Sequence, residues 1–237
     1  MSKRVYRPNS VTPQNAAKQC HDLVAASVIA PHILPRCLPE SAQTMRQQAQ
    51  RAIKQGDYSQ AIAALNRLII RQGARAEDFN NRGLVHLWNG ELHKAIRDFD
   101  HAITLNPELP AAYNNRANYY AALGDLELAL ADYDQTIDLN PFHVRARINQ
   151  GITLRELGCY DVALESFDNA LLFNQCLGDA YAERGRTYHL RGDWNCAIAD
   201  YRRALQELAS IDAEARLNLN SCRYRVMNWL SELSIAA

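Results

Sequence analysis

The sequence predicts an all-α fold, a right-handed α-solenoid of five helix–turn–helix units closed by a C-terminal helix. The first observation is a row of glycines 34 residues apart: Gly56, Gly90, Gly124, Gly158 and Gly192. The second is an alanine five residues after each glycine: Ala61, Ala95, Ala129, Ala163 and Ala197. The third is a large apolar residue four positions later: Leu65, Phe99, Tyr133, Phe167 and Tyr201. Unrelated segments do not keep one register through five copies, so the chain is a repeat array.

Residues 1–41 precede the repeats and are predicted to form a separate Pro-containing extension. They hold five of the eight prolines, each of which removes a backbone donor and discourages helix. One helix with an apolar end is expected at residues 14–30. Its most apolar part, Leu23–Ala30, is short and is closed by Pro31, which disfavours a signal peptide.

The repeats are predicted at residues 42–75, 76–109, 110–143, 144–177 and 178–209. Position 8 of each repeat is small, which allows its two helices to approach closely: Ala49, Gly83, Ala117, Gly151 and Gly185. The glycine at position 15 suits the left-handed turn that ends a first helix. We expect Asp57, Asp125 and Asp193 to cap second helices. Pro107 and Pro141 are expected to end the second helices of repeats two and three.

Residues 210–237 are predicted to form a C-terminal capping helix. Its apolar positions are Leu217, Leu219, Val226, Trp229 and Leu230. No glycine and alanine follow in register, so this segment lacks a second helix. A terminal helix that covers the exposed apolar edge is what a stack of repeats needs.

These residues resemble the tetratricopeptide repeat (TPR) family, whose 34-residue units have small residues at positions 8 and 20, an aromatic near 24 and proline at 32. The resemblance covers residues 42–209 and is closest at 79–107 and 113–141. It implies a superhelix whose first helices line a concave inner face, and the repeat sequences suggest a bacterial source. Gly73, Gln175 and Ala209 replace the usual proline, which leaves the ends of those helices open.

Arginine at position 7 occurs only in repeats that have aspartate at position 23. The three pairs are Arg82 with Asp98, Arg116 with Asp132, and Arg184 with Asp200. In repeat four both positions change together, to Gln150 and Ser166. We predict that the two positions face each other across the helix pair, because a partly buried arginine without its carboxylate is costly. These arginines are therefore assigned to structure rather than to ligand binding.

Asparagines recur at positions 5, 6 and 9, on the face that lines the groove in the family: Asn80, Asn81, Asn114, Asn115, Asn118 and Asn149. An amide both donates and accepts, so such a row can pair with the backbone of an extended peptide. The row resembles the asparagine ladder in the repeat superhelix of O-linked N-acetylglucosamine transferases; the alternative is a solvated helix face. Arg145 and Arg155 add positive charge, and these eight residues form the predicted partner-binding site. Only Asn115 fully fits the carboxylate clamp of chaperone-binding members, which excludes that type of site.

The charge balance and the cysteines exclude several other classes of protein. Net charge is zero, which disfavours a nucleic-acid partner, yet residues 1–75 carry 11 basic and 3 acidic residues, and residues 76–140 carry 4 and 11. No apolar run is long enough to span a membrane. The six cysteines have no C-x-x-C spacing, so we expect free thiols in a reducing cytoplasm and no metal. No phosphate-binding glycine loop or nucleophile–base pair is recognisable, so we expect no cofactor and no enzyme.

The sequence therefore predicts a non-catalytic interaction scaffold or adaptor that binds a peptide or a partner helix in the concave groove. The alternative is a self-assembling structural protein, in which the basic N-terminal part docks on acidic repeats two and three of another copy. In a further variant the extension occupies its own groove. Single-stranded RNA recognition ranks last, because the inner positions of repeats two and three lack basic residues.

Overall fold

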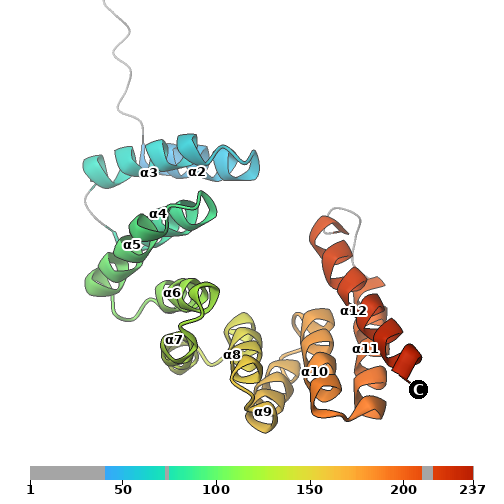
Figure 1. Ribbon diagram of the computed structural model, residues 1–237. Helices are drawn as coiled ribbons and strands as arrows, with labels where there is room; N and C mark the ends of the chain where they lie inside the picture. Colours follow the sequence, from blue (N-terminus) through green and yellow to red (C-terminus); the bar gives the residue numbers. More distant parts are fainter. Residues whose placement is uncertain (1–40, 73–74, 210–215, 237) are drawn as a thin grey trace, which may run out of the picture. The chain divides into compact units, whose positions relative to one another are not determined.

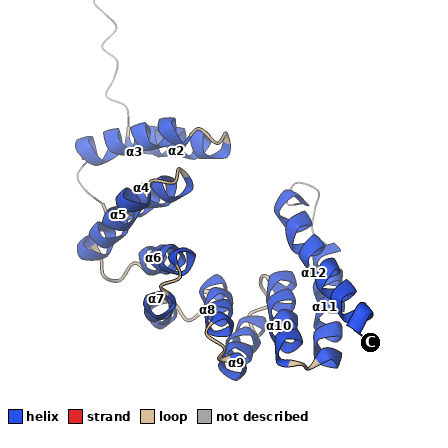
Figure 2. Ribbon diagram, in the orientation of Figure 1, coloured by secondary structure: helices blue, strands red, loops and turns tan. Residues whose placement is uncertain are grey.

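The computed structural model describes residues 41–72, 75–209 and 216–236, and these residues form eleven helices and no strand (Figures 1 and 2). The helices are α2 (Ala42–Lys54), α3 (Tyr58–Gln72), α4 (Ala76–Trp88), α5 (Leu92–Leu105), α6 (Pro110–Leu123), α7 (Leu126–Leu139), α8 (Val144–Glu156), α9 (Tyr160–Leu171), α10 (Leu177–Arg191), α11 (Trp194–Ala209) and α12 (Arg216–Ala236). The prediction of an all-α solenoid is confirmed. The predicted extension, with its helix at residues 14–30, lies outside the described residues except for Ser41.

Consecutive helices pack in pairs, and each pair packs on the next (Figure 1). The first helix of each pair is α2, α4, α6, α8 or α10, and the second is the helix that follows it. The second helix of one pair also contacts the first helix of the next pair. In addition α4, α6, α8, α10 and α12 contact one another in succession. These five helices therefore form one continuous row, which we call the first-helix face.

The turns inside the pairs follow the predicted glycine ladder, and all five ladder glycines have positive φ, such as 84° at Gly124. The capping prediction holds only in part. Asp57 accepts a hydrogen bond from the Gln60 amide at 2.9 Å, as expected for a cap. Asp125 makes no side-chain cap, so that prediction is wrong, and the Asp193 carboxylate pairs with Arg191. The cap residue of α7 is held instead by its backbone amide, which donates to the carbonyl of Tyr120.

The second helices end as the prolines predict, and repeat four departs where its proline is missing. Helices α5 and α7 stop two residues before Pro107 and Pro141. In repeat four, α9 already ends at Leu171, and Asn174 and Cys176 adopt left-handed backbone conformations before α10 begins. The chain changes direction through these two residues, and a left-handed conformation costs conformational energy in residues other than glycine.

The core between the helices of a pair depends on the small residue at position 8 and the large one at position 24. The ring of Phe99 is fully buried and lies directly against the α4 backbone at Gly83. A Cβ added at Gly83 would lie 2.8 Å from this ring, and one at Gly151 would lie 2.7 Å from Phe167. Two helices can therefore approach this closely only because position 8 carries no bulky side chain.

The predicted arginine–aspartate pairs are confirmed, and the arginine also reaches the preceding repeat. Arg116 donates from Nε and Nη2 to the two oxygens of Asp132 at 2.7 and 2.8 Å, and from Nη1 to Asp100 of repeat two at 2.8 Å. Arg82 and Arg184 repeat this pattern, with Asn66 and Asp168 as their second partners. Hydrogen bonding to Asp132 raises the pKa of Arg116 above its ordinary value. Position 7 thus joins each such repeat to the one before it.

The C-terminal helix α12 packs on α11 and α10, as predicted for a capping helix. Val226 and Leu233 are buried in one cluster with Tyr201 and Leu208, and Trp229 packs against this cluster. The side chains of Leu217 and Leu219 lie outside the described residues. The buried residues of α12 cover the apolar side that α11 would otherwise expose.

Candidate functional site

Three of the predicted asparagines meet where α4 and α6 pack on the first-helix face. The amide nitrogen of Asn115 donates to the side-chain oxygen of Asn80 at 2.9 Å. Asn114 in turn donates to Asn115 at 3.4 Å. Asn80 is buried, while Asn114 and Asn115 are half-buried. This cluster joins repeats two and three and leaves the buried Oδ1 of Asn114 without a partner among the described residues.

A second amide cluster joins repeats three and four. The side-chain oxygen of Asn118 accepts from the Tyr133 hydroxyl at 2.7 Å and from the Asn149 amide at 2.9 Å. Burial raises the pKa of Tyr133, so its hydroxyl remains a donor at any physiological pH. Asn149 uses its nitrogen in this contact, and its oxygen remains an acceptor.

Arg155, the predicted site residue near the C-terminal end of α8, pairs with an acidic residue of repeat five. Glu183 on α10 is only 4% exposed. Its carboxylate accepts from Arg155 at 2.8 Å and pairs with Arg225 of α12 at 3.1 Å. Arg155 therefore belongs to an ion network around the buried Glu183 that connects α8, α10 and α12.

The other two predicted residues, Asn81 and Arg145, are exposed. Arg145 borders a cavity of about 180 Å³ between α8, α10 and α12. Its lining residues are Arg145, Ile148, Asn149, Ile152, Cys176, Asp179, Glu183 and Arg225. Three predicted site residues thus lie at or beside this cavity. Arg145 and Asn149 line it, and Arg155 bonds Glu183, which also lines it.

Sequence reasoning missed the contributions of α12 and of the repeat-five helix to this cavity. Arg225 lies beyond the last repeat, so no column of equivalent residues marks it. Asp179 and Cys176 lie where the α9–α10 connection departs from the repeat pattern. The helical periodicity of apolar residues within 216–236 was the one available signal for a helix, and it gives no contact partners.

Cys222 reports whether α12 is docked beside this cavity. Its side chain is buried, and burial together with the nearby Asp179 carboxylate raises the pKa of the thiol to about 11. Because the thiolate is the reactive form, N-ethylmaleimide at mildly alkaline pH is expected to label Cys222 about 100-fold more slowly than a thiol of ordinary pKa. The exposed Cys159 and Cys196 are internal controls, followed by peptide mass spectrometry. Equal labelling rates would show that α12 is not held in this position.

Within the ranges 41–72, 75–209 and 216–236, no group of three or more His, Cys, Asp or Glu side chains is placed to hold a metal ion. In the same ranges no helix combines the length and the apolar character needed to cross a bilayer. The features of the first-helix face are therefore hydrogen-bonding amides, an ion network and one partly apolar cavity.

Sequence and structure comparisons agree on the type of repeat. Sequence models of the tetratricopeptide repeat family match residues 46–110 and 110–143. No curated protein matches the chain. Among solved structures, the fold is similar to a tetratricopeptide repeat protein from Parabacteroides merdae (TM-score 0.63, 21% identity, 82% of this chain and 75% of that chain).

Two further solved structures have the same fold. TTC0263, a thermophilic TPR protein from Thermus thermophilus, has a TM-score of 0.63 at 20% identity over 77% of this chain and 98% of its own. MamA has a TM-score of 0.59 at 20% identity over 67% of this chain and 92% of its own. At these identities the similarity establishes the arrangement of helices.

Proposed function

The chain belongs to the tetratricopeptide repeat family, whose members generally serve as scaffolds for protein–protein interaction, and we propose that it binds a peptide or a partner helix on its first-helix face. The observation that carries this proposal is the cavity between α8, α10 and α12. It combines an apolar surface with charged and amide groups, as binding sites for short segments usually do.

The walls of this cavity suit a segment that has both an apolar and an acidic side chain. Ile148 and Ile152 supply apolar surface from α8. Arg145 is exposed and has no ion pair among the described residues, so its guanidinium is available to a carboxylate. The oxygen of Asn149 can accept a hydrogen bond from the backbone of the bound segment.

The asparagines of repeats two and three extend this surface along the neighbouring first helices. Asn81 is exposed, and the clusters around Asn115 and Asn118 fix the amides of their neighbours in defined orientations. Fixed amides bind a backbone with a smaller loss of side-chain entropy than free ones. We therefore propose that apolar burial sets the affinity and that the asparagines set the direction of the bound chain.

Selection from a peptide display library on the full-length protein tests this function. We expect selected peptides to combine apolar and acidic residues, and Ile152→Asp and Arg145→Glu each to weaken them at least about tenfold, equivalent to about 1.4 kcal/mol. Arg202→Glu on α11 makes the same charge change away from the face and is the matched control, expected to change affinity less than about twofold. Fluorescence anisotropy measures all four proteins, with circular dichroism to verify folding.

The asparagine row has its own test in the same assay. Alanine at Asn81, Asn115 and Asn149 together is expected to weaken selected peptides while the apolar preference of the selection stays the same. Unchanged affinity of the triple variant would remove the asparagines from the site. Unchanged affinity of both cavity variants, Ile152→Asp and Arg145→Glu, would remove the cavity from the function.

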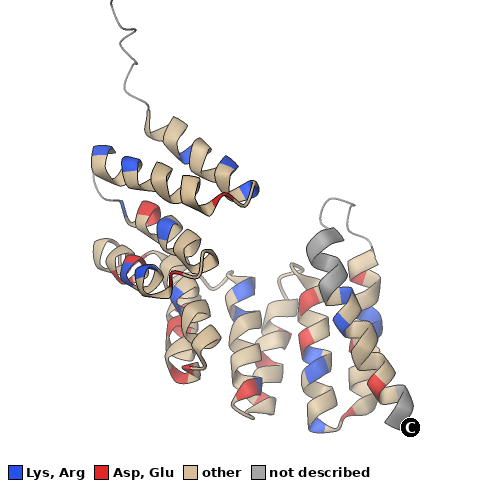
Figure 3. Ribbon diagram, turned by 45° about the horizontal axis from the view of Figure 1, so that its top comes forward, with Lys and Arg blue, Asp and Glu red and all other residues tan. Residues whose placement is uncertain are grey.

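Charge distribution supports self-assembly as the second candidate function. Helices α2 and α3 contain five basic and no acidic residues, and α7 contains four acidic and no basic residues (Figure 3). Exposed Arg51, Lys54 and Arg71 have no ion pair within the described part of the chain. If these surfaces join two copies, the mass in sedimentation is expected to fall toward the monomer between about 50 mM and about 500 mM salt. A monomer at both salt concentrations would exclude this function.

A further inference from the structure

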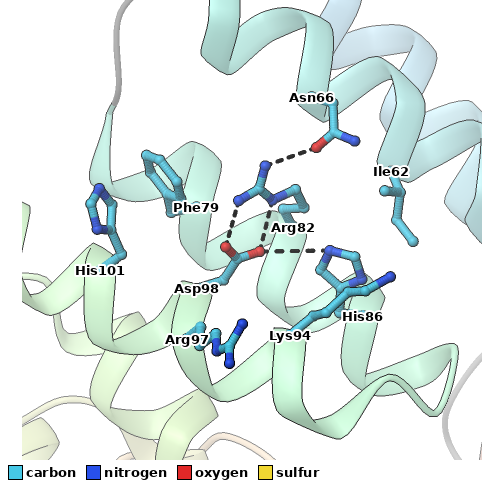
Figure 4. Close-up of a pocket in the computed structure, with 9 residues that line it drawn as sticks. All are labelled: Ile62, Asn66, Phe79, Arg82, His86, Lys94, Arg97, Asp98 and His101. Carbon is cyan, nitrogen blue, oxygen red and sulfur yellow. Dashed lines mark hydrogen bonds and ion pairs between the residues drawn. The ribbon is translucent and has the colours of Figure 1, made fainter.

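A second cavity lies away from the first-helix face, between α3, α4 and α5, and it has a volume of about 520 Å³ (Figure 4). Its lining residues are Ile62, Asn66, Phe79, Arg82, His86, Lys94, Arg97, Asp98 and His101. We propose that this basic cavity binds an acidic segment of a protein partner, with a carboxylate at Lys94 and Arg97 and an apolar side chain against Ile62 and Phe79. The proposal shares no residue with the first-helix site and goes beyond the scaffold function.

The exposed basic groups of the cavity lie on one side of α5. Lys94, Arg97 and His101 are separated by three and four residues, which places them on the same face of a helix. All three are exposed. The opposite wall, from α3, consists of Ile62 and Asn66 and carries no charge. Nothing across the cavity therefore neutralises the α5 row.

The only carboxylate in the lining is already neutralised by a half-buried arginine. Asp98 accepts from Nε and Nη2 of Arg82 at 2.8 and 2.6 Å. The remaining Nη1 of Arg82 donates to Asn66 at 2.8 Å, so each of the three guanidinium nitrogens already has a partner (Figure 4). His86 lies with its Nε2 3.8 Å from Asp98 on the same floor. The floor of the cavity thus contributes no unpaired negative charge that would repel an acidic ligand.

Of the two exposed cations at the rim, Lys94 is already paired and Arg97 is available to a ligand. Lys94 pairs with Glu91 at 3.0 Å, and Glu91 also accepts from His86. Arg97 has no ion pair within residues 41–72, 75–209 and 216–236. A carboxylate that enters the cavity meets Arg97 directly and displaces only an exposed contact at Lys94. Exposed ion pairs are weak, so this exchange is inexpensive.

The same cavity offers apolar surface beside the positive charge. The ring of Phe79 packs against the His101 ring of the α5 row, with the ring centroids 4.3 Å apart. Ile62 of α3 is half-buried and faces the same space. The volume lies in the range of sites that hold several side chains. A segment with neighbouring acidic and apolar residues fits both halves of the lining.

The surrounding charge favours a short acidic peptide over a nucleic acid. Residues 76–140 carry 4 basic and 11 acidic residues, so the basic cavity lies within an acidic part of the chain. A nucleic acid has phosphates that continue beyond the cavity and would meet these carboxylates. A peptide needs negative charge only at the position of Lys94 and Arg97.

A fluorescent peptide of repeating Glu, Leu and Gly tests the cavity in the full-length protein. Anisotropy is expected to show binding that the double variant Lys94→Gln/Arg97→Gln weakens about tenfold. Arg202→Gln/Arg223→Gln removes two exposed charges from α11 and α12 and is the matched control, expected to stay within about twofold of the wild type. A second probe, with Gln in place of every Glu, is expected to bind no more tightly to the wild type than to the double variant.

Photo-crosslinking then locates the peptide and separates this proposal from the scaffold function. With a photoreactive leucine analogue in the probe, mass spectrometry is expected to find crosslinks in residues 58–72 and 76–88, which contain Ile62 and Phe79. Crosslinks confined to α8, α10 and α12 would place the peptide in the other site and overturn the proposal. Equal loss of binding in the two double variants would also overturn it.

Two further measurements show whether the cavity binds a protein partner, a nucleic acid or a second copy of the chain. An oligothymidine probe that binds more tightly than the acidic peptide, and loses binding in Lys94→Gln/Arg97→Gln, would assign the cavity to nucleic acid. A dimer of the protein alone that dissociates in this variant would assign the cavity to a second copy of the chain. Either result contradicts a separate protein partner, and the absence of both supports it.

Discussion

Replacing Arg116 with alanine is expected to lower the free energy of unfolding by about 3 kcal/mol, at the lower end of the range for breaking a buried ion pair. The variant leaves the Asp132 carboxylate, which is only 6% exposed, without its two hydrogen bonds at 2.7 and 2.8 Å. It also removes the contact with Asp100 of the preceding repeat. Urea unfolding followed by circular dichroism measures the change.

Two further variants show whether the missing charge is the cause. Arg116→Ala/Asp132→Ala is expected to regain part of the lost stability, because no unpaired carboxylate then remains buried. Gln150→Ala changes the same position in repeat four, where the side chain bonds only Asp134 among the described residues, and is expected to cost less than about 1 kcal/mol. If Arg116→Ala has wild-type stability and fails to bind peptide, the arginine belongs to the binding site.

Replacing Phe99 with alanine is expected to cost about 3–5 kcal/mol, the usual range for deleting a fully buried aromatic ring. The ring fills the space between α4 and α5, and its removal leaves a cavity that these helices close only in part. The same urea titration measures the loss. Tyr224→Ala, on a side chain 67% exposed, is the control and is expected to change stability by less than about 0.5 kcal/mol.

The contact between Phe99 and Gly83 makes a second, sharper test. In the wild type, Gly83→Ala places a methyl group 2.8 Å from the ring and is expected to destabilise. In the Phe99→Ala background the ring contact is gone and the Ala95 carbonyl oxygen, 3.1 Å from the added methyl group, remains, so Gly83→Ala is expected to destabilise less than it does in the wild type. Additive effects of the two changes would show that ring and backbone do not press on each other.

The sequence was sufficient for the fold because each structural role repeats at a fixed position. The glycine turns, the small residue at position 8 and the ring at position 24 recur in register, so five copies served as an internal comparison. The same comparison predicted that Arg116 faces Asp132, because both residue types change together in repeat four. These features depend on local geometry that is the same in every repeat.

The candidate site was only partly predictable, because its contacts depend on side-chain conformations between repeats. The asparagine columns showed which face carries amides, whereas the bonds of Asn115 to Asn80 and of Asn149 to Asn118 require the actual spacing of the helices. The ion network around Glu183 includes Arg225, which stands outside the register. The basic cavity includes the recurring pair Arg82 and Asp98, but its two exposed cations, Lys94 and Arg97, stand at positions where no other repeat has a basic residue.

The position-7 bonds between repeats have a consequence for mechanical resistance. Arg82, Arg116 and Arg184 each connect two neighbouring repeats through a charged group. At the junction of repeats three and four the corresponding link is the amide of Gln150, and no ion pair crosses this junction within the described residues. When the chain is pulled from both ends in an optical trap, we expect the repeats to separate first at this junction. The two halves would then yield as separate force events.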